Sequence, residues 1–101
     1  MKTEIFDCIL NQVSNTTEIS KDDIVGKTKT SDMVEARAMV VYLGKKYGLS
    51  DRFLMTKLNR KSTFGIRYLA SQFYSMQKAS FSFREAVLQA EQNIANILPK
   101  T

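Results

Sequence analysis

The side chains with the clearest chemical potential are basic, and they are concentrated between residues 27 and 67. This window holds ten basic and three acidic residues, a net charge of 10 − 3 = +7, whereas the rest of the chain holds five basic and seven acidic residues, 5 − 7 = −2. Cations gathered in one region are typical of a protein that binds a polyanion, although a solvated surface that serves solubility has the same composition. The ten basic residues are Lys27, Lys29, Arg37, Lys45, Lys46, Arg52, Lys57, Arg60, Lys61 and Arg67.

Most catalytic chemistry is disfavoured by the residues that the chain lacks. There is no histidine, which removes the commonest general base and metal ligand. The single cysteine, Cys8, shares a helical repeat with Ile5 and Ile9 and is expected to be a buried, inert thiol. Residues 26–28 (Gly-Lys-Thr) match the end of a phosphate-binding loop, but Lys21 stands where that motif requires glycine. We therefore expect no enzymatic activity, cofactor, metal or small-molecule substrate; an active site of carboxylates alone is the alternative.

Two helices joined by a short turn would position the basic residues for binding to duplex DNA. The pattern at 51–58 and 64–78, with a polar turn between, predicts a helix-turn-helix within about residues 50–78. In such a motif the second helix enters the major groove and the first crosses the backbone. Any well-capped helical turn has similar residues, so the motif gains weight only together with the basic window. The candidate DNA-contacting residues are Lys27, Lys29, Arg37, Arg52, Lys57, Asn59, Arg60, Lys61, Ser62, Thr63 and Arg67.

Different contacts are expected from different parts of this set. Residues 60–63 surround the start of the second helix, where backbone N–H groups and the helix dipole also attract phosphate. Arg67, one turn further on, is expected to reach a guanine edge. Arg52 and Lys57 on the first helix would contact phosphates, and Lys27 and Lys29 would contact the adjacent backbone or minor groove.

The whole chain is predicted to be helical. Hydrophobic residues recur every three or four positions, and no segment alternates as a strand would. The pattern predicts helices at about 3–14, 21–25, 32–47, 51–58, 64–78 and 83–98, and thus an all-α, compact bundle of five to six helices in a single domain, 1–101. Helix 32–47 is apolar enough to be buried on more than one side. Expected helix caps are Ser20, Ser31, Ser50, Ser62 or Thr63, and Ser82, and expected helix-ending glycines are Gly26 and Gly48.

The sequence contains no feature typical of a membrane protein. No apolar run approaches the roughly 20 residues needed to cross a bilayer, and the N-terminal segment carries acids where a secretion signal is basic. The basic residues are spread over loops and several helices, which disfavours binding to a membrane surface through one amphipathic helix. We expect a cytoplasmic protein.

Three segments carry a resemblance to a known family. They are residues 27–30 (Lys-Thr-Lys-Thr), 35–43 (Glu-Ala-Arg-Ala-Met-Val-Val-Tyr-Leu) and 58–66 (Leu-Asn-Arg-Lys-Ser-Thr-Phe-Gly-Ile). In these segments, and in element lengths over about residues 4–75, the chain resembles the C-terminal DNA-binding domain of the bacterial replication initiator DnaA. That domain is a relative of the Trp-repressor helix-turn-helix class. The resemblance implies a DnaA-like helix-turn-helix that binds duplex DNA, without the family's ATPase domain.

The departures from this family fall where base recognition takes place. The family's signature histidine is absent, and without a gap residues 62–65 (Ser-Thr-Phe-Gly) replace its Asp-His-Thr-Thr; one deletion would instead align Ser62 and Thr63 with its hydroxyl pair. Glu35 stands where the family has an arginine that enters the minor groove. These differences argue against recognition of the initiator's usual origin box.

Two hypotheses for the function follow. The first is a module that binds duplex DNA and has a regulatory or replication-related role. It would be cytoplasmic, of bacterial type, and associated with the nucleoid. The alternative is a helical module that has kept the fold, lost DNA contact, and binds an acidic protein or itself. The exposed aromatic residues that would favour this alternative are Phe64, Tyr68, Tyr74 and Phe81.

Overall fold

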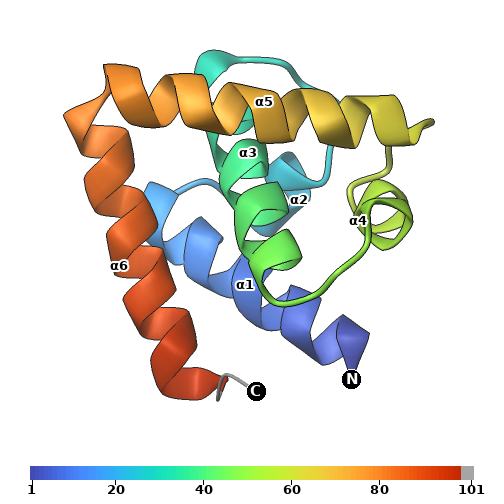
Figure 1. Ribbon diagram of the computed structural model, residues 1–101, viewed down its shortest axis with the longest axis horizontal. Coiled ribbons are helices and arrows are strands. Elements are labelled where there is room, and N and C mark those ends of the chain that lie inside the picture. The colour runs from blue at the N-terminus through green and yellow to red at the C-terminus, as the bar shows by residue number, and fades with distance from the viewer. Residues whose placement is uncertain (99–101) are drawn as a thin grey trace.

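The computed structural model describes residues 1–98, which form six α-helices (Figure 1). No strand occurs within this part of the chain. The all-α bundle that the hydrophobic repeat predicts is therefore confirmed. The first helix is longer than predicted, because it continues to Thr17 rather than ending near residue 14. The elements are α1 (Lys2–Thr17), α2 (Lys21–Ile24), α3 (Ser31–Lys46), α4 (Asp51–Lys57), α5 (Thr63–Ala79) and α6 (Phe81–Ile97).

Helix α3 is the centre of the fold. In Figure 1, α5 lies across one end of α3, α6 runs down one side, and α1 passes along the end opposite α5. Residues 36–41 are all buried. Six consecutive positions extend over more than one full turn of helix, so α3 is covered on every side at its middle. This confirms the expectation that the most apolar helix is buried on more than one face.

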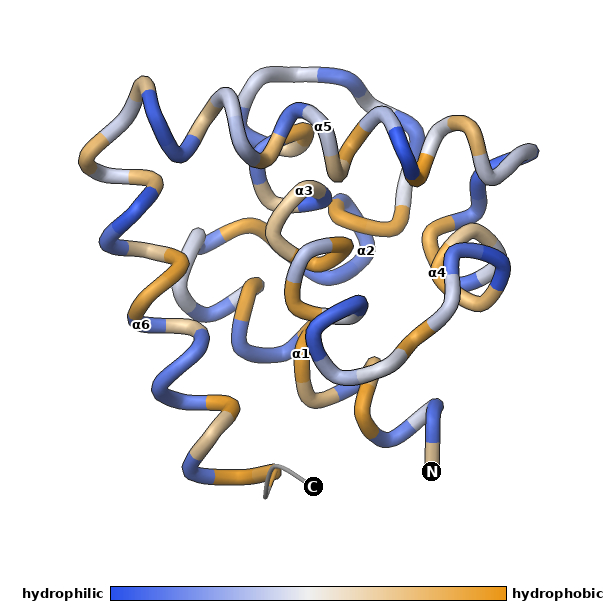
Figure 2. Tube along the Cα trace, in the orientation of Figure 1, coloured by the Kyte–Doolittle hydropathy of each residue, from blue (hydrophilic) through white to orange (hydrophobic). Residues whose placement is uncertain are grey.

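Helices α5 and α6 are amphipathic and close two sides of the core. Figure 2 shows hydrophobic and hydrophilic residues alternating along both helices. Where the two helices meet, the Phe73 ring stacks on Tyr42 with 4.0 Å between ring centroids and meets Phe83 edge-on at 5.4 Å. Both geometries are favourable for aromatic pairs, so this cluster fixes α5 against α3 and α6. The buried residues of the two helices are Ile66, Leu69, Phe73, Phe83, Val87, Ala90 and Ile94.

Two of the predicted helix caps are confirmed. The hydroxyl oxygens of Ser20 and Ser50 accept hydrogen bonds from backbone N–H groups at the starts of α2 and α4, each at 3.1 Å. The prediction of Ser82 as the cap of α6 is wrong. The cap is Ser80, which accepts from the Phe83 N–H at 3.1 Å. Because α5 continues to Ala79, the break between the last two helices is a single residue with an extended backbone.

The start of α3 also differs from the prediction. Ser31 is the first residue within the helix, and Thr30 precedes it as the N-cap. Thr30 makes no side-chain capping bond, and neither does Ser62, which precedes α5. The side chains of these two N-cap residues therefore do not stabilise the starts of α3 and α5 by capping hydrogen bonds.

Gly48 and Gly65 make a matched pair for testing backbone conformation. Gly48 follows α3 with φ of +87°, whereas Gly65 lies inside α5, and an added Cβ would meet nothing within 4 Å at either position. Gly48→Ala is expected to lower the free energy of unfolding by about 1 kcal/mol, because alanine is strained in the left-handed region. Gly65→Ala is expected to raise it by about 0.5 to 1 kcal/mol, because alanine favours the helix. Urea denaturation measures both; shifts of the same sign would contradict this account.

None of the helices within residues 1–98 combines the length and the apolar content needed to cross a bilayer.

Candidate nucleic-acid interface

Helices α4 and α5 and the residues between them form the predicted helix-turn-helix. In Figure 1, α4 is seen nearly end-on and α5 from the side, so their axes cross at a wide angle. The chain turns at Asn59, which has a left-handed backbone with φ of +56°. The N–H of Arg60 then donates to the carbonyl oxygen of Met55 at 2.9 Å and closes α4. This compact turn sets the start of α5 at the corner of the molecule.

The first turns of α5 present free polar groups. Lys61, Ser62 and Arg67 are exposed, Thr63 is half-buried, and no acidic residue occurs in the first turn. Neither Lys61 nor Arg67 forms an ion pair within residues 1–98. The first N–H groups of a helix have no partner inside the helix, and with the helix dipole they attract anions. The start of α5 therefore combines two cations with unpaired backbone donors.

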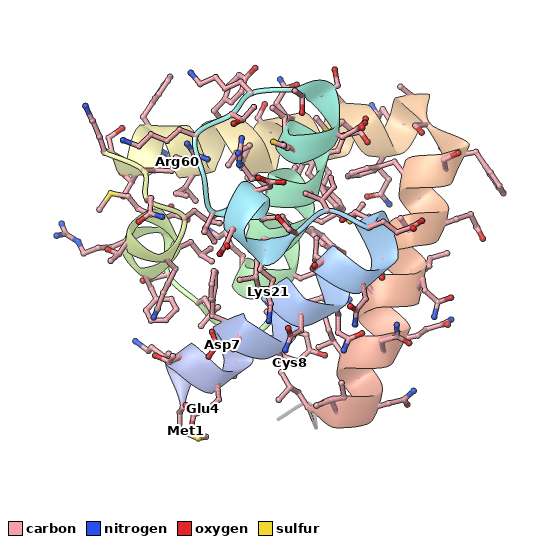
Figure 3. The ribbon with its side chains drawn as sticks, turned by 180° about the vertical axis from the view of Figure 1, so that it is seen from behind. Met1, Glu4, Asp7, Cys8, Lys21 and Arg60 are labelled. Carbon is pink, nitrogen blue, oxygen red and sulfur yellow. The ribbon has the colours of Figure 1, made fainter. Side chains whose placement is uncertain are left out.

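The turn before α5 is tied to the segment after α2. The side-chain amide of Asn59 donates to the carbonyl oxygen of Val25 at 2.9 Å, and Nη2 of Arg60 donates to that of Gly26 at 2.8 Å. Figure 3 shows Arg60 between these two parts of the chain. The loop that follows Gly26 carries Lys27 and Lys29, both exposed. The two hydrogen bonds thus bring the basic loop to the start of α5.

The structure corrects the expected role of Arg37. Its side chain is only 2% exposed, so it does not belong to a surface that a duplex could reach. Nε donates to the carbonyl oxygen of Ile24 at 2.7 Å, and Nη2 donates to that of Asp23 at 2.9 Å. The guanidinium is therefore committed to the end of α2, and we remove Arg37 from the DNA-contacting set.

Together these bonds cap the C-terminus of α2. The last carbonyl groups of a helix have no partner within it, and α2 is only four residues long. Each carbonyl oxygen in the run 23–26 accepts from a side chain of α3 or of the turn before α5. Gly26 follows the end of α2, as expected, and its φ is not in the left-handed region. An added Cβ would lie 3.1 Å from the Asp22 carbonyl oxygen. A side chain at this position would therefore be crowded by the backbone of α2.

The remaining basic residues between 27 and 67 differ in their exposure and in whether they form ion pairs. Arg52 is exposed on α4, and Lys57 is half-buried with its ammonium 5.6 Å from the centre of the Phe53 ring. Lys45 pairs with Asp51 at 2.7 Å, and Lys46 pairs with Glu91 of α6. The two lysines at the end of α3 are thus partly neutralised, whereas Arg52 forms no ion pair within residues 1–98.

Arg37 and Arg60 lie close enough to influence each other. Burial lowers the pKa of Arg37 below its ordinary value, the positive charge of Arg60 lowers it further, and Asp23 opposes these effects. Burial also lowers the pKa of Arg60. Neither guanidinium forms an ion pair with a carboxylate in the described part of the chain. The region between α2, α3 and α5 therefore carries an excess of positive charge.

Glu35, where the resemblance places a minor-groove arginine, faces a different part of the molecule. It borders a groove with Asp32, Ser80 and Phe83, whereas Lys29 borders a separate groove beside α5. Burial raises the pKa of Glu35, and the negative charge of Asp32 raises it further. Its carboxylate therefore lies outside the basic region at the start of α5.

The outer face of α5 carries three of the four aromatic residues that the sequence offered as candidates for exposure. Phe64, Tyr68 and Tyr74 are exposed, and so are two basic residues of the same helix, Arg67 and Lys78. Residues 63–79 contain no acidic side chain at all. The sequence indicated these aromatic residues as candidates for exposure, but not that they share the outer side of α5 with basic residues. This face is thus both cationic and aromatic.

The described residues bring together no group of three histidine, cysteine or carboxylate side chains that could hold a metal ion. No family model, no curated protein and no solved structure matches this chain.

Proposed function

We propose that this protein is a duplex DNA-binding module that inserts the start of α5 into the major groove. The observation that carries the proposal is the pair of hydrogen bonds from Asn59 and Arg60 to the segment after α2. They join two basic segments 34 residues apart in sequence into one surface. We call Lys27, Lys29, Lys61, Ser62 and Arg67 the basic surface, and all five are exposed.

Each part of the basic surface suits a different contact. The major groove is about 12 Å wide and admits one helix, and Arg67 projects from the first turns of α5, where an arginine can pair with guanine. Lys61, Ser62 and Thr63 would hold a phosphate with the N–H groups of α5. Lys27 and Lys29 would contact the neighbouring backbone, and Arg52 and Lys57 of α4 the backbone on the other side. Asn59 and Arg60 hold the turn.

The resemblance to the replication initiator's DNA-binding domain supports a regulatory or replication-related role. That resemblance concerns the order of the elements and the segments 27–30, 35–43 and 58–66. Without that family's histidine, specificity here would depend on Arg67 and on the aromatic residues beside it. Most of the affinity would come from phosphate contacts, which makes binding strongly dependent on salt.

Lys61→Ala is expected to weaken duplex binding by about three- to tenfold at low salt and to reduce the salt slope, the change in log K with log salt, by about one unit. The reason is that one phosphate contact, and the counterion that it releases, is lost. The measurement is fluorescence anisotropy on a labelled mixed-sequence duplex over a salt series. Lys2→Ala removes another exposed lysine, from α1, and is expected to leave the slope unchanged. Equal slopes for all three proteins would remove Lys61 from the interface.

The exposed aromatic residues favour a second candidate, an interaction module for an acidic protein or for a second copy of the chain. Phe64 is 70% exposed, Phe81 68% and Tyr74 63%, and aromatic residues are enriched in the cores of protein interfaces. The anisotropy experiment separates the candidates. No binding to the duplex at low salt, with a mass that rises with concentration in light scattering, would favour the interaction module over the DNA-binding module.

A further inference from the structure

A groove separates the loop at 27–30 from the first half of α5. Its volume is about 470 Å³, which is within the range of small-ligand sites. Lys29 of the loop, Arg37 of α3 and Arg60 of the turn line it, together with residues of α5. None of the lining residues is acidic. Three cations from three separate elements therefore converge on one small space without an anion.

The two arginines in this groove have unused hydrogen-bonding capacity. Arg60 donates through Nη2, but its Nε is buried without an acceptor. Arg37 uses Nε and Nη2 for backbone carbonyls, and its Nη1 makes no hydrogen bond within residues 1–98. A buried charged donor without an acceptor is costly. The mutual repulsion of the two guanidinium groups, which lowers the pKa of Arg37, adds to that cost. An anion in the groove would offset the repulsion between the two guanidinium groups.

The rest of the groove suits a flat apolar group. Val34 and Leu69 supply hydrophobic contacts, and Tyr68, which is 53% exposed, supplies an aromatic ring. Gly65 also lines the groove, and an added Cβ there would meet nothing within 4 Å, so the backbone of α5 is uncovered at this point. The groove thus combines a cationic part with an apolar part that includes one aromatic ring.

We propose that this groove binds a nucleoside 5′-monophosphate, with the phosphate held by Lys29 and Arg60, attracted further by the charge of the buried Arg37, and the base packed on Tyr68. A phosphate carries a charge of about −1.5 to −2 at neutral pH, which suits three cations. Planar guanidinium groups bind its oxygens in pairs. The site goes beyond the proposed function, since the ligand is a small molecule, and it does not require that the protein binds duplex DNA.

The test is isothermal titration calorimetry of the folded protein, without DNA, against three probes at constant ionic strength: adenosine 5′-monophosphate, inorganic phosphate and adenosine. The expected result is saturable binding of the monophosphate, binding of phosphate about tenfold weaker, and no binding of adenosine. Tyr68→Ala is expected to weaken binding of the monophosphate by about tenfold, the loss typical of one base stacked on an aromatic ring, and to leave phosphate binding unchanged. Lys29→Gln is expected to weaken both.

Arg52→Gln is the matched control, because it removes an exposed cation of α4 that does not line the groove. It is expected to bind the monophosphate as the unchanged protein does. Amide NMR gives a second measurement: the Gly65 signal is expected to shift on addition of the monophosphate while that of Gly48 stays in place. The proposal would be overturned by no binding at millimolar monophosphate, by equal binding of phosphate and monophosphate, or by equal losses in Arg52→Gln and Lys29→Gln. None of these outcomes depends on whether duplex DNA is bound.

Discussion

Arg37→Ala is expected to lower the free energy of unfolding by about 3 kcal/mol. The substitution removes two hydrogen bonds from a charged donor, each typically worth roughly 1.5 to 3 kcal/mol. It leaves the Ile24 carbonyl oxygen without its side-chain donor, whereas the Asp23 carbonyl oxygen still accepts from the Gly26 N–H at 3.2 Å. Relief of the repulsion from Arg60 and of the cost of burying a charge offsets part of this loss. The hydrogen bonds outweigh these gains because both acceptors are satisfied at short distance. Urea denaturation followed by circular dichroism measures the change.

Two further variants make this prediction specific. Arg37→Lys keeps the charge but presents one compact ammonium in place of a planar fork, so it is expected to recover only part of the lost stability. Arg52→Ala removes an exposed arginine and is expected to change the free energy of unfolding by no more than about 0.5 kcal/mol. If Arg37→Ala also changed the free energy of unfolding by no more than about 0.5 kcal/mol, the buried hydrogen bonds of Arg37 would contribute little to stability.

Reversing two charges of the basic surface is expected to lower affinity for duplex DNA by about a hundredfold or more at low salt. In the double variant Lys61→Glu and Arg67→Glu, two attractive contacts become repulsive where the phosphates are expected to lie. Both side chains are exposed and form no ion pair within residues 1–98, so the fold is expected to remain intact. Anisotropy titrations with a labelled duplex measure the affinity.

The control for this variant must change the net charge by the same amount. Lys2→Glu with Lys78→Glu also takes the net charge from +5 to 5 − 4 = +1, and both lysines are exposed. Lys78 lies in the last turn of α5, at the other end of the same helix. This control is expected to lose less than about tenfold in affinity, through the general field alone. Equal losses in both double variants would mean that the start of α5 is not the contact surface.

The features of the fold that the sequence predicted are those set by nearby residues. The six helices follow from the repeat of hydrophobic residues, and the caps at Ser20 and Ser50 bond to groups three residues away. The left-handed turn at Gly48 is equally local. The sequence predicted Ser82 rather than Ser80 as the cap of α6, because both serines precede the same hydrophobic repeat and the pattern does not show that α5 continues to Ala79.

The candidate site could be predicted only in part, because its assembly depends on contacts distant in sequence. The sequence identified Lys61 and Arg67 as polar residues at the start of a helix, and both are exposed. It gave no sign that Arg37 serves backbone groups 13 and 14 residues earlier, or that Asn59 and Arg60 reach 34 residues back. The sequence does not show whether a basic side chain bonds to a backbone carbonyl group or is free to bind a phosphate. In this structure the buried Arg37 is distinguished from the exposed Lys61 and Arg67 by its burial.

The capping of α2 also bears on the order in which the protein folds. A helix of four residues does not gain enough from its own hydrogen bonds to nucleate, and its last carbonyl groups depend on Arg37, Asn59 and Arg60. We therefore expect the segment to become ordered after α3 and the turn before α5 have formed. Its native contacts would then form after the transition state for folding. Substitutions in residues 21–26 would then act mainly by accelerating unfolding, while the rate of folding stays nearly constant.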